Sequence, residues 1–270
     1  MHQVTITYAI VTAIVQGLTE YLPISSSGHL AIVNHFFGVG SNFGLSFTIW
    51  LHGATLLALL AYFYRDIFDL IRCWAPSHRH DMAPQRRIFV FIVLATIVTG
   101  PMGVVINKFM PSLDSNLIAV GIGFIVTTIF LVLSEFLSTR VAHKRLDRLG
   151  AGRALFIGFM QGLAIPPGVS RSGTTIAAGL ISGLDREQAT RYSFLVGIPA
   201  IVASFLLDVV GTHGIALNTP AIIGFVLAGV IGYLSIAFLL ALVKRVKLYG
   251  FAAYTGLLAI AVLVIRALKL

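Results

Sequence analysis

Hydrophobic residues run along the chain in long blocks separated by short polar segments. Six of these blocks are close to the ~20 residues that an α-helix needs to cross a bilayer. They cover residues 46–64, 88–106, 117–139, 192–211, 220–243 and 251–267. The pattern predicts an all-α polytopic membrane protein with six transmembrane helices.

Two further apolar segments, about 5–37 and 154–182, are interrupted by polar residues, Pro and Gly. A single crossing by the second segment would place two basic loops on opposite sides of the membrane. These are the loop at 140–153 before it and the loop with Arg186 and Arg191 after it. A broken, re-entrant helix pair keeps both loops on one side, and the same count gives the first segment the same form. We therefore expect two re-entrant helix–loop–helix segments in addition to the six spans.

The composition agrees with a membrane protein. The chain is 57% hydrophobic and 11% charged, with a mean hydropathy of +0.94, whereas soluble domains carry about a quarter charged residues. No polar block is long enough for a soluble domain, so residues 1–270 are expected to form a single membrane domain. No basic segment precedes the first apolar block and no small-residue cleavage site follows it, so a removable signal peptide is not expected.

The positions of Lys and Arg predict the orientation of the chain. None precedes Arg65, and most of those that follow gather in segments 65–87, 140–153 and 244–247, with nearly neutral loops between them. This alternation is the positive-inside pattern, which places the basic loops in the cytoplasm. The net charge of +9 thus mostly indicates topology and contact with anionic lipid. It does not indicate nucleic acid binding.

The two interrupted segments share an internal repeat. "QGLTEYLPISSSG" at 16–28 aligns without a gap to "QGLAIPPGVSRSG" at 161–173, with six of thirteen positions identical. The identical pairs are Gln16/Gln161, Gly17/Gly162, Leu18/Leu163, Ser25/Ser170, Ser27/Ser172 and Gly28/Gly173. Halves 1–140 and 150–270 would each hold one re-entrant segment and three spans. Because three is odd, the second half starts from the opposite side. This predicts an inverted-topology repeat with its site near the midplane, in a polar cavity between the broken helices.

The second motif has the residues of an anion site. Arg171 is an intramembrane charge, which favours a functional role, although a structural ion pair with Glu20 is the alternative. Hydroxyl groups, exposed backbone and a helix beginning near Gly173 would together suit a phosphate group. The candidate phosphate ligands in this motif are Ser170, Ser172, Gly173 and Thr174.

The first motif supplies complementary chemistry. An ionised Glu20 only accepts hydrogen bonds, so beside a phosphate it needs a metal ion or a proton to transfer. Ser25, Ser26 and Ser27 offer a nucleophile or phosphate ligands, and His29 offers a general acid or base. His35 and His52 lack such neighbours in sequence and are expected to be structural. The two motifs together predict phosphoryl transfer to water, and a site at membrane depth implies a substrate with a lipid tail.

The motifs "QGLTEYLPISSSGH" and "PGVSRSG" resemble those of the undecaprenyl-diphosphate phosphatase family, bacterial membrane enzymes also called bacitracin-resistance proteins. The resemblance covers essentially the whole chain. It implies an inverted repeat and hydrolysis of the C55 polyprenyl diphosphate to its monophosphate, which recycles the carrier lipid for cell-wall synthesis. It also implies a divalent cation, Mg or Ca, and an active site open to the outer face.

The family's functional positions fall on residues of this sequence. Its two acidic positions correspond to Gln16 and Glu20, its proposed nucleophile to Ser26, its histidine to His29, and its arginine to Arg171. Many relatives have Glu where this chain has Gln16. With Gln there, Glu20 is left as the carboxylate for metal binding or base chemistry.

Several alternatives remain open in the sequence. The nucleophile is Ser26, His29 or water. A flippase for polyprenyl phosphate could use the same phosphate site, but it would need no acid/base pair such as Glu20 with His29. A glycine-rich run at 224–232 would pack against another helix either within the chain or in a homodimer.

Overall fold

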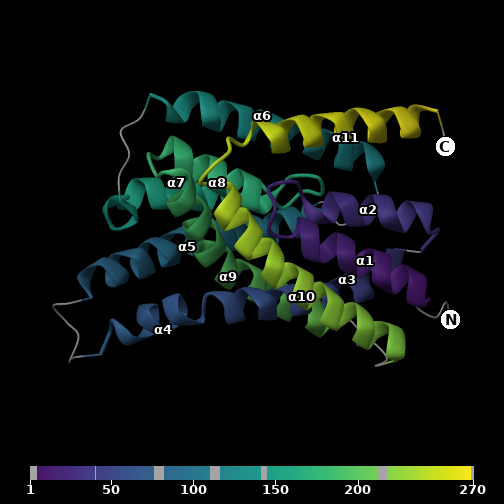
Figure 1. Cartoon of the computed structure of the whole chain (residues 1–270), viewed down its shortest axis with the longest axis horizontal. Coiled ribbons are helices and arrows are strands. Elements are labelled where there is room, and N and C mark those ends of the chain that lie inside the picture. Colours follow the sequence, from purple (N-terminus) through teal and green to yellow (C-terminus); the bar gives the residue numbers. More distant parts are fainter. Residues whose placement is uncertain are drawn as a thin grey trace.

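The computed structural model describes residues 5–39, 41–75, 82–109, 116–140, 145–211 and 218–268, and the regular elements within them are helices. They are α1 (Ile6–Thr19), α2 (Ser26–Phe36), α3 (Ser41–Tyr62), α4 (Tyr64–Arg72), α5 (Ala83–Phe109), α6 (Leu117–Ser138), a 3-10 turn (Leu146–Arg148), α7 (Ala151–Gly162), α8 (Arg171–Ile181), α9 (Arg186–Gly211), α10 (Thr219–Leu242) and α11 (Tyr249–Ala267). Figure 1 shows the N- and C-terminal ends at the same end of the molecule.

Helices long and apolar enough to span a bilayer dominate the described residues. Five qualify on their own, namely α5, α6, α9, α10 and α11, and a sixth qualifies if α3 and α4 are counted as one span with a 67° bend. Large apolar side chains are exposed along them, as a lipid-facing surface requires: Ile97, Val104, Ile122, Ile129, Val226, Val230, Leu257 and Ile260. The prediction of a multi-pass, all-helical membrane protein is confirmed at this level.

Some helices extend further into polar sequence than predicted. Helix α4 occupies part of the expected basic loop, because its Ile67 and Leu70 pack against the main hydrophobic core while its charged residues face outward. Helix α9 begins at Arg186 rather than near residue 192. Its first turns tolerate charge because Arg186 and Arg191 are ion-paired.

Glu135 lies near the end of the 117–139 apolar block, a place typical of an interfacial residue, and its side chain is buried in the protein. It is 1% exposed. Its carboxylate accepts two hydrogen bonds from the Arg186 guanidinium, at 2.9 and 2.5 Å, and one from the backbone N–H of Leu248 at 2.8 Å. The pair therefore joins α6, α9 and the start of α11, and all of the carboxylate's charge is compensated by the protein.

Both interrupted segments consist of two helices separated by a break. The first break lies at 20–25 between α1 and α2, and the second at 163–170 between α7 and α8. Helix α6 packs closely against the second break. A Cβ on Gly123 of α6 would overlap the backbone of the break, and a Cβ on Gly168 of the break would overlap the backbone of α6. Thr127 also accepts a hydrogen bond from the Ser170 N–H and donates one to the Gly168 carbonyl. The second break is thus fixed by direct backbone packing.

The glycine-rich run of α10 packs within the chain. A Cβ on Gly224 would collide with Phe47 of α3, and Gly232 lies against Thr55 of α3 and Tyr21. Of the two alternatives for this run, internal packing is the one observed. These glycines therefore offer no support for a homodimer, which stays a prediction.

Candidate active site

The two predicted motifs meet at the helix breaks. The Arg171 guanidinium donates to Oε1 of Glu20 at 2.8 Å, and the Ser172 hydroxyl donates to the Leu22 carbonyl at 2.9 Å. Glu20 is 8% exposed, and Figure 1 shows α1, α2 and α8 converging in the interior of the molecule. The two motifs are therefore in direct contact here, and the polar cavity expected between them stays a prediction.

The helices that follow the two breaks start in the same way. The hydroxyls of Ser25 and Ser170 cap α2 and α8 by accepting hydrogen bonds from the N–H groups of Gly28 and Gly173, at 3.4 and 3.0 Å. In both motifs the hydroxyl of the serine two residues after the cap, Ser27 or Ser172, lies 3.2 Å from the cap oxygen. The identical positions of the repeat therefore give both helices the same side-chain cap, although the backbone of the cap residue differs, with φ of +68° at Ser25 and −75° at Ser170.

The backbone at Ser25 is strained. Its φ is +68°, the one positive value at a non-glycine residue in the part of the chain that the structure describes. Such conformations cost on the order of 1–3 kcal/mol and cluster at functional sites. This strain lies directly before Ser26, the first residue of α2.

Ser26 and Arg171 occupy the same position on their helices, the first residue after the cap. The first N–H groups of a helix have no partner within it, and the peptide dipoles add a partial positive charge there. Two helix starts that meet beside Arg171 thus form a positive environment, which suits a phosphate group.

Glu20 is the acceptor at the centre of the site. Its Oε2 accepts hydrogen bonds from the Ser26 hydroxyl at 2.6 Å and from Nε2 of Gln16 at 3.1 Å. The Ser26 proton therefore already points at a carboxylate, which is the geometry for general-base removal of that proton. The charge of Arg171 balances that of the carboxylate.

Several buried polar atoms of the site have no hydrogen-bond partner among the described residues. They are Oε1 of Gln16, Nη1 of Arg171 and Oγ1 of Thr174. Buried polar groups are nearly always paired, so each such atom needs an explanation. Nη1 lies in the space left by the missing side chain of Gly197, where a Cβ would collide with it. A donor of a buried guanidinium left free in this way is available to a bound anion.

His29 does not contact Glu20 or Ser26 through its ring nitrogens. Nδ1 lies 2.7 Å from the Ser25 carbonyl oxygen, and Nε2 lies 2.7 Å from the hydroxyl of Tyr254 on α11. The sequence grouped His29 with Glu20 as an acid/base pair. The structure instead brings together Gln16, Glu20, Ser26 and Arg171, and places His29 beside α11.

His52, expected to be structural, lies beside the central carboxylate. Its Nε2 is 3.5 Å from Oε2 of Glu20, while its Nδ1 is bonded to the Thr48 carbonyl. Thr55, one helical turn later on α3, contacts Nε2 of Gln16 at 3.4 Å. The spacing of His52 and Thr55 places two polar groups on one face of an apolar span, and this signal could have identified both residues.

The described residues contain no cluster of three His, Cys, Asp or Glu side chains able to hold a metal ion. The site offers one carboxylate, Glu20, and the unpartnered oxygen of Gln16. Two oxygen ligands do not enclose a cation. They do fit the mode in which Mg²⁺ is held by one carboxylate together with substrate phosphates.

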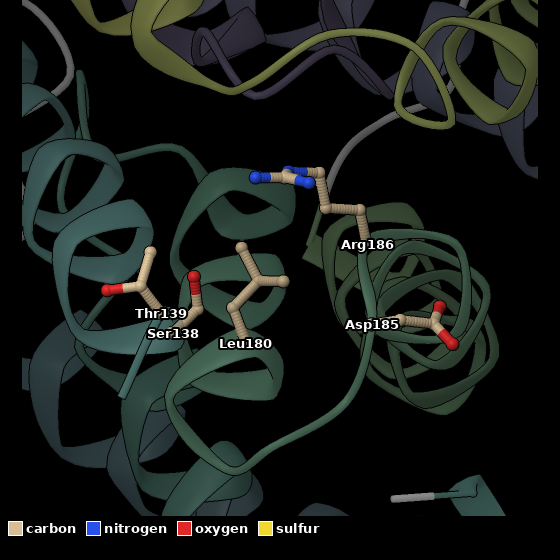
Figure 2. A pocket seen from close by; sticks show the side chains of 5 residues that line it. All are labelled: Ser138, Thr139, Leu180, Asp185 and Arg186. Atoms are coloured by element: carbon tan, nitrogen blue, oxygen red, sulfur yellow. The ribbon is translucent and has the colours of Figure 1, made fainter. Parts of the chain in front are cut away.

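A cavity of about 140 Å³ lies away from the motifs. It is lined by Ser138, Thr139, Leu180, Asp185 and Arg186, where the ends of α6 and α8 meet the start of α9 (Figure 2). Its ionic groups already have partners: Asp185 accepts from the N–H of Gln188 at 2.8 Å, and Arg186 is paired with Glu135. The cavity therefore has no free charged group for chemistry.

Comparison with known proteins gives a consistent result. The family model for "Bacitracin resistance protein BacA" matches residues 9–261. An undecaprenyl-diphosphatase of Korarchaeum cryptofilum is 35% identical over 96% of this chain and 98% of its own length. One of Desulforapulum autotrophicum is 36% identical over 93% and 96%, and one of Treponema denticola is 39% identical over 91% and 92%.

Proposed function

We infer that this chain, which belongs to the bacitracin resistance protein BacA family, is a membrane phosphatase that hydrolyses undecaprenyl diphosphate to the monophosphate and phosphate. The reaction recycles the carrier lipid for peptidoglycan synthesis and confers resistance to bacitracin. The observation that carries this function is the contact of Ser26 and Arg171, each at a helix start, with the same carboxylate, Glu20.

Ser26 is proposed as the nucleophile and Glu20 as its base. The hydroxyl proton passes to Glu20 as the Ser26 oxygen bonds to the terminal phosphorus. The bridging P–O bond breaks, and undecaprenyl phosphate leaves with that oxygen. Glu20 passes the proton that it received to the departing undecaprenyl phosphate and is ionised again. It then takes a proton from water as the water oxygen bonds to phosphorus. The P–Oγ bond to Ser26 breaks, the Ser26 oxygen takes that proton from Glu20, and phosphate leaves. The 2.6 Å contact between Ser26 and Glu20 supports the first proton transfer.

Arg171 is proposed to bind the phosphate through its free Nη1. The charge that develops on the phosphoryl oxygens would be stabilised by this guanidinium and by the two helix starts, which are already oriented in the folded protein. The proposed phosphate-binding groups also include Gln16, Ser25, Ser27, Ser170, Ser172, Gly173 and Thr174. The unpartnered, buried hydroxyl of Thr174 supports its inclusion.

A divalent cation, Mg²⁺ or Ca²⁺, is proposed to accompany the diphosphate. Glu20 and Oε1 of Gln16 would hold it together with substrate oxygens. The cation would neutralise phosphate charge when bound. His29 remains the proposed acid or base, and in this state both of its ring nitrogens are engaged.

The finer architecture is also proposed: six spans, two re-entrant segments and an inverted repeat of halves 1–140 and 150–270. Helix α1 packs along α10, and α7 packs along α5. In such a repeat α1 corresponds to α7 and α10 corresponds to α5, so the two contacts are equivalent. This equivalence supports the inverted repeat. Basic loops would face the cytoplasm of the plasma membrane, and the site would open to the outer face.

The direct test is phosphate release from C55 diphosphate in detergent, with Mg²⁺, Ca²⁺ or EDTA, for wild type and Glu20→Gln. Glu187→Gln is the matched control, because this carboxylate lies outside both motifs and is half-exposed in a pair with Lys244. We expect cation-dependent release that Glu20→Gln abolishes and Glu187→Gln preserves.

Transport of polyprenyl phosphate is the rival function for the same phosphate site. Folded protein that binds the lipid and yet releases no phosphate under any of these conditions would overturn the phosphatase. Movement of the lipid across reconstituted vesicles by that protein would then assign the site to a flippase.

A further inference from the structure

His29 is held by two hydrogen bonds that define its chemical state. The Ser25 carbonyl oxygen can only accept, so Nδ1 of His29 must carry the proton that lies between them. In the neutral ring Nε2 is then an acceptor, and the Tyr254 hydroxyl at 2.7 Å must donate to it. The two ring planes are nearly parallel, at 6°, with their centroids 5.6 Å apart.

Tyr254 reaches His29 from the far end of the chain, 225 residues away. The neighbouring Thr255 fixes the register of α11 on α6 through a hydroxyl contact of 2.8 Å with Thr128. Phe124 of α6 packs its ring edge-on against His29. The imidazole thus lies between α6 and α11, and the Tyr254 hydroxyl contacts the one nitrogen that could exchange a proton.

We propose that Tyr254 is a positioning residue, which holds the His29 ring with Nε2 directed at α11 and thereby sets how His29 takes part in the reaction. The proposal rests on the proposed phosphatase function. Tyr254 is 45% exposed, so its ring adds little to the core. The hydroxyl is its specific contribution.

The test is a double-mutant cycle of Tyr254→Phe and His29→Ala, with kcat and KM for C55 diphosphate measured separately. Tyr254→Phe keeps the ring and removes one hydrogen bond, so kcat should fall roughly 3- to 10-fold with KM unchanged. His29→Ala should lower kcat further, and the double variant should match His29→Ala alone. Tyr249→Phe, another exposed tyrosine of α11, is the matched control and should retain wild-type kcat.

Three results would overturn the proposal: wild-type kcat in Tyr254→Phe, effects that multiply in the double variant, or a change in KM alone. The last would place Tyr254 on the lipid tail. Thermal unfolding in detergent identifies a variant that fails to fold. In that case Tyr254→His, which retains a ring donor, provides the second test and should keep more kcat than Tyr254→Leu.

A spectroscopic measurement separates this proposal from the phosphatase assignment. In protein labelled with ¹⁵N-histidine, the His29 signals are assigned by their loss in His29→Ala. Tyr254→Phe should shift the Nε2 resonance and leave Nδ1 protonated. An unchanged Nε2 resonance contradicts the contact even if wild type hydrolyses the lipid. If the Nε2 resonance shifts in a protein that releases no phosphate, the contact between Tyr254 and His29 is supported and the phosphatase function is contradicted.

Discussion

The two broken segments, α1–α2 and α7–α8, build their second helices alike but carry different chemistry at them. Ser25 and Ser170 form the same side-chain cap, and each lies 3.2 Å from the hydroxyl of the serine two residues later. One residue later the first segment has Ser26 and the second has Arg171. Glu20 aligns with an isoleucine, Ile165, and His29 aligns with Thr174.

The comparison separates two kinds of position in the repeat. Identical positions supply the hydroxyl cap that both segments use to start a helix within the membrane. Positions that differ bring together a hydroxyl, a carboxylate and a guanidinium, which a phosphatase needs once each. Resemblance between the motifs therefore indicates the fold of the site, and differences between them indicate its chemistry.

The largest expected effect follows removal of the Ser26 hydroxyl, which has no counterpart in the second segment. Ser26→Ala should lower kcat by about 1,000-fold or more, as loss of a nucleophile does in hydrolases, while the protein remains folded because the Ser25 cap is untouched. Phosphate release under single-turnover conditions measures it. Retained hydrolysis would assign the attack to water, with Ser26 in a binding role.

A smaller loss is expected from Arg171→Lys. Lysine keeps the charge but lacks the planar fork that contacts Glu20 and leaves Nη1 free for an anion. One charge-assisted hydrogen bond is worth about 1.5–3 kcal/mol, so kcat/KM should fall roughly 10- to 150-fold. Full activity in Arg171→Lys would show that charge alone is sufficient. Ser26 holds the position that corresponds to Arg171 in the other segment. Ser26→Thr, which keeps a hydroxyl, is therefore the matched conservative control and should lose less kcat/KM.

The identical glutamines offer a test of the cation site. Gln16→Glu adds a carboxylate beside Glu20, so the Mg²⁺ concentration that gives half-maximal activity should fall roughly tenfold, since affinity rises with ligand charge. Gln161→Glu is the control from the other segment, because Gln161 contacts Thr99. Calorimetric titration of Mg²⁺ checks both variants. An equal response of the two would remove Gln16 from the proposed ligands.

The smallest effects are expected at the caps. Ser25→Ala and Ser170→Ala should each lower the free energy of unfolding by about 1 kcal/mol, the usual contribution of a serine cap. Guanidinium or thermal unfolding in detergent measures the two values. A much larger cost at only one of them would break the equivalence of the two helix starts.

Much of this arrangement could be predicted from the sequence because it depends on local pattern. The apolar blocks gave the long helices, and Pro, Gly and Ser clusters marked both breaks within a few residues of their positions. The bilayer strengthens such signals, because unpaired backbone in lipid is costly. The prediction that Glu20 and Arg171 share a site follows from the rarity of charge at that depth.

Contacts between distant segments could not be predicted from one sequence. Glu135 lies near the end of an apolar span, which is typical of an interfacial residue. Its partners, Arg186 and Leu248, follow it by 51 and 113 positions, so its burial could not be predicted from nearby sequence. Tyr254 lies on an apolar span and its partner His29 is 225 positions away, so only packing shows that the two residues meet. Helix α4 was missed because its amphipathic pattern lies within a strongly charged segment.

The seam between Glu20 and Arg171 also limits how such a protein could have originated. A symmetric pair of half-length chains in the proposed inverted arrangement would present the same residue at both helix starts, two serines or two arginines. Two stretches of sequence that differ, as in this single chain, let one helix start carry the acid and hydroxyl and the other carry the guanidinium. Division of labour between the proposed halves thus requires that they are not identical copies, and one polypeptide keeps the unlike halves together in equal number.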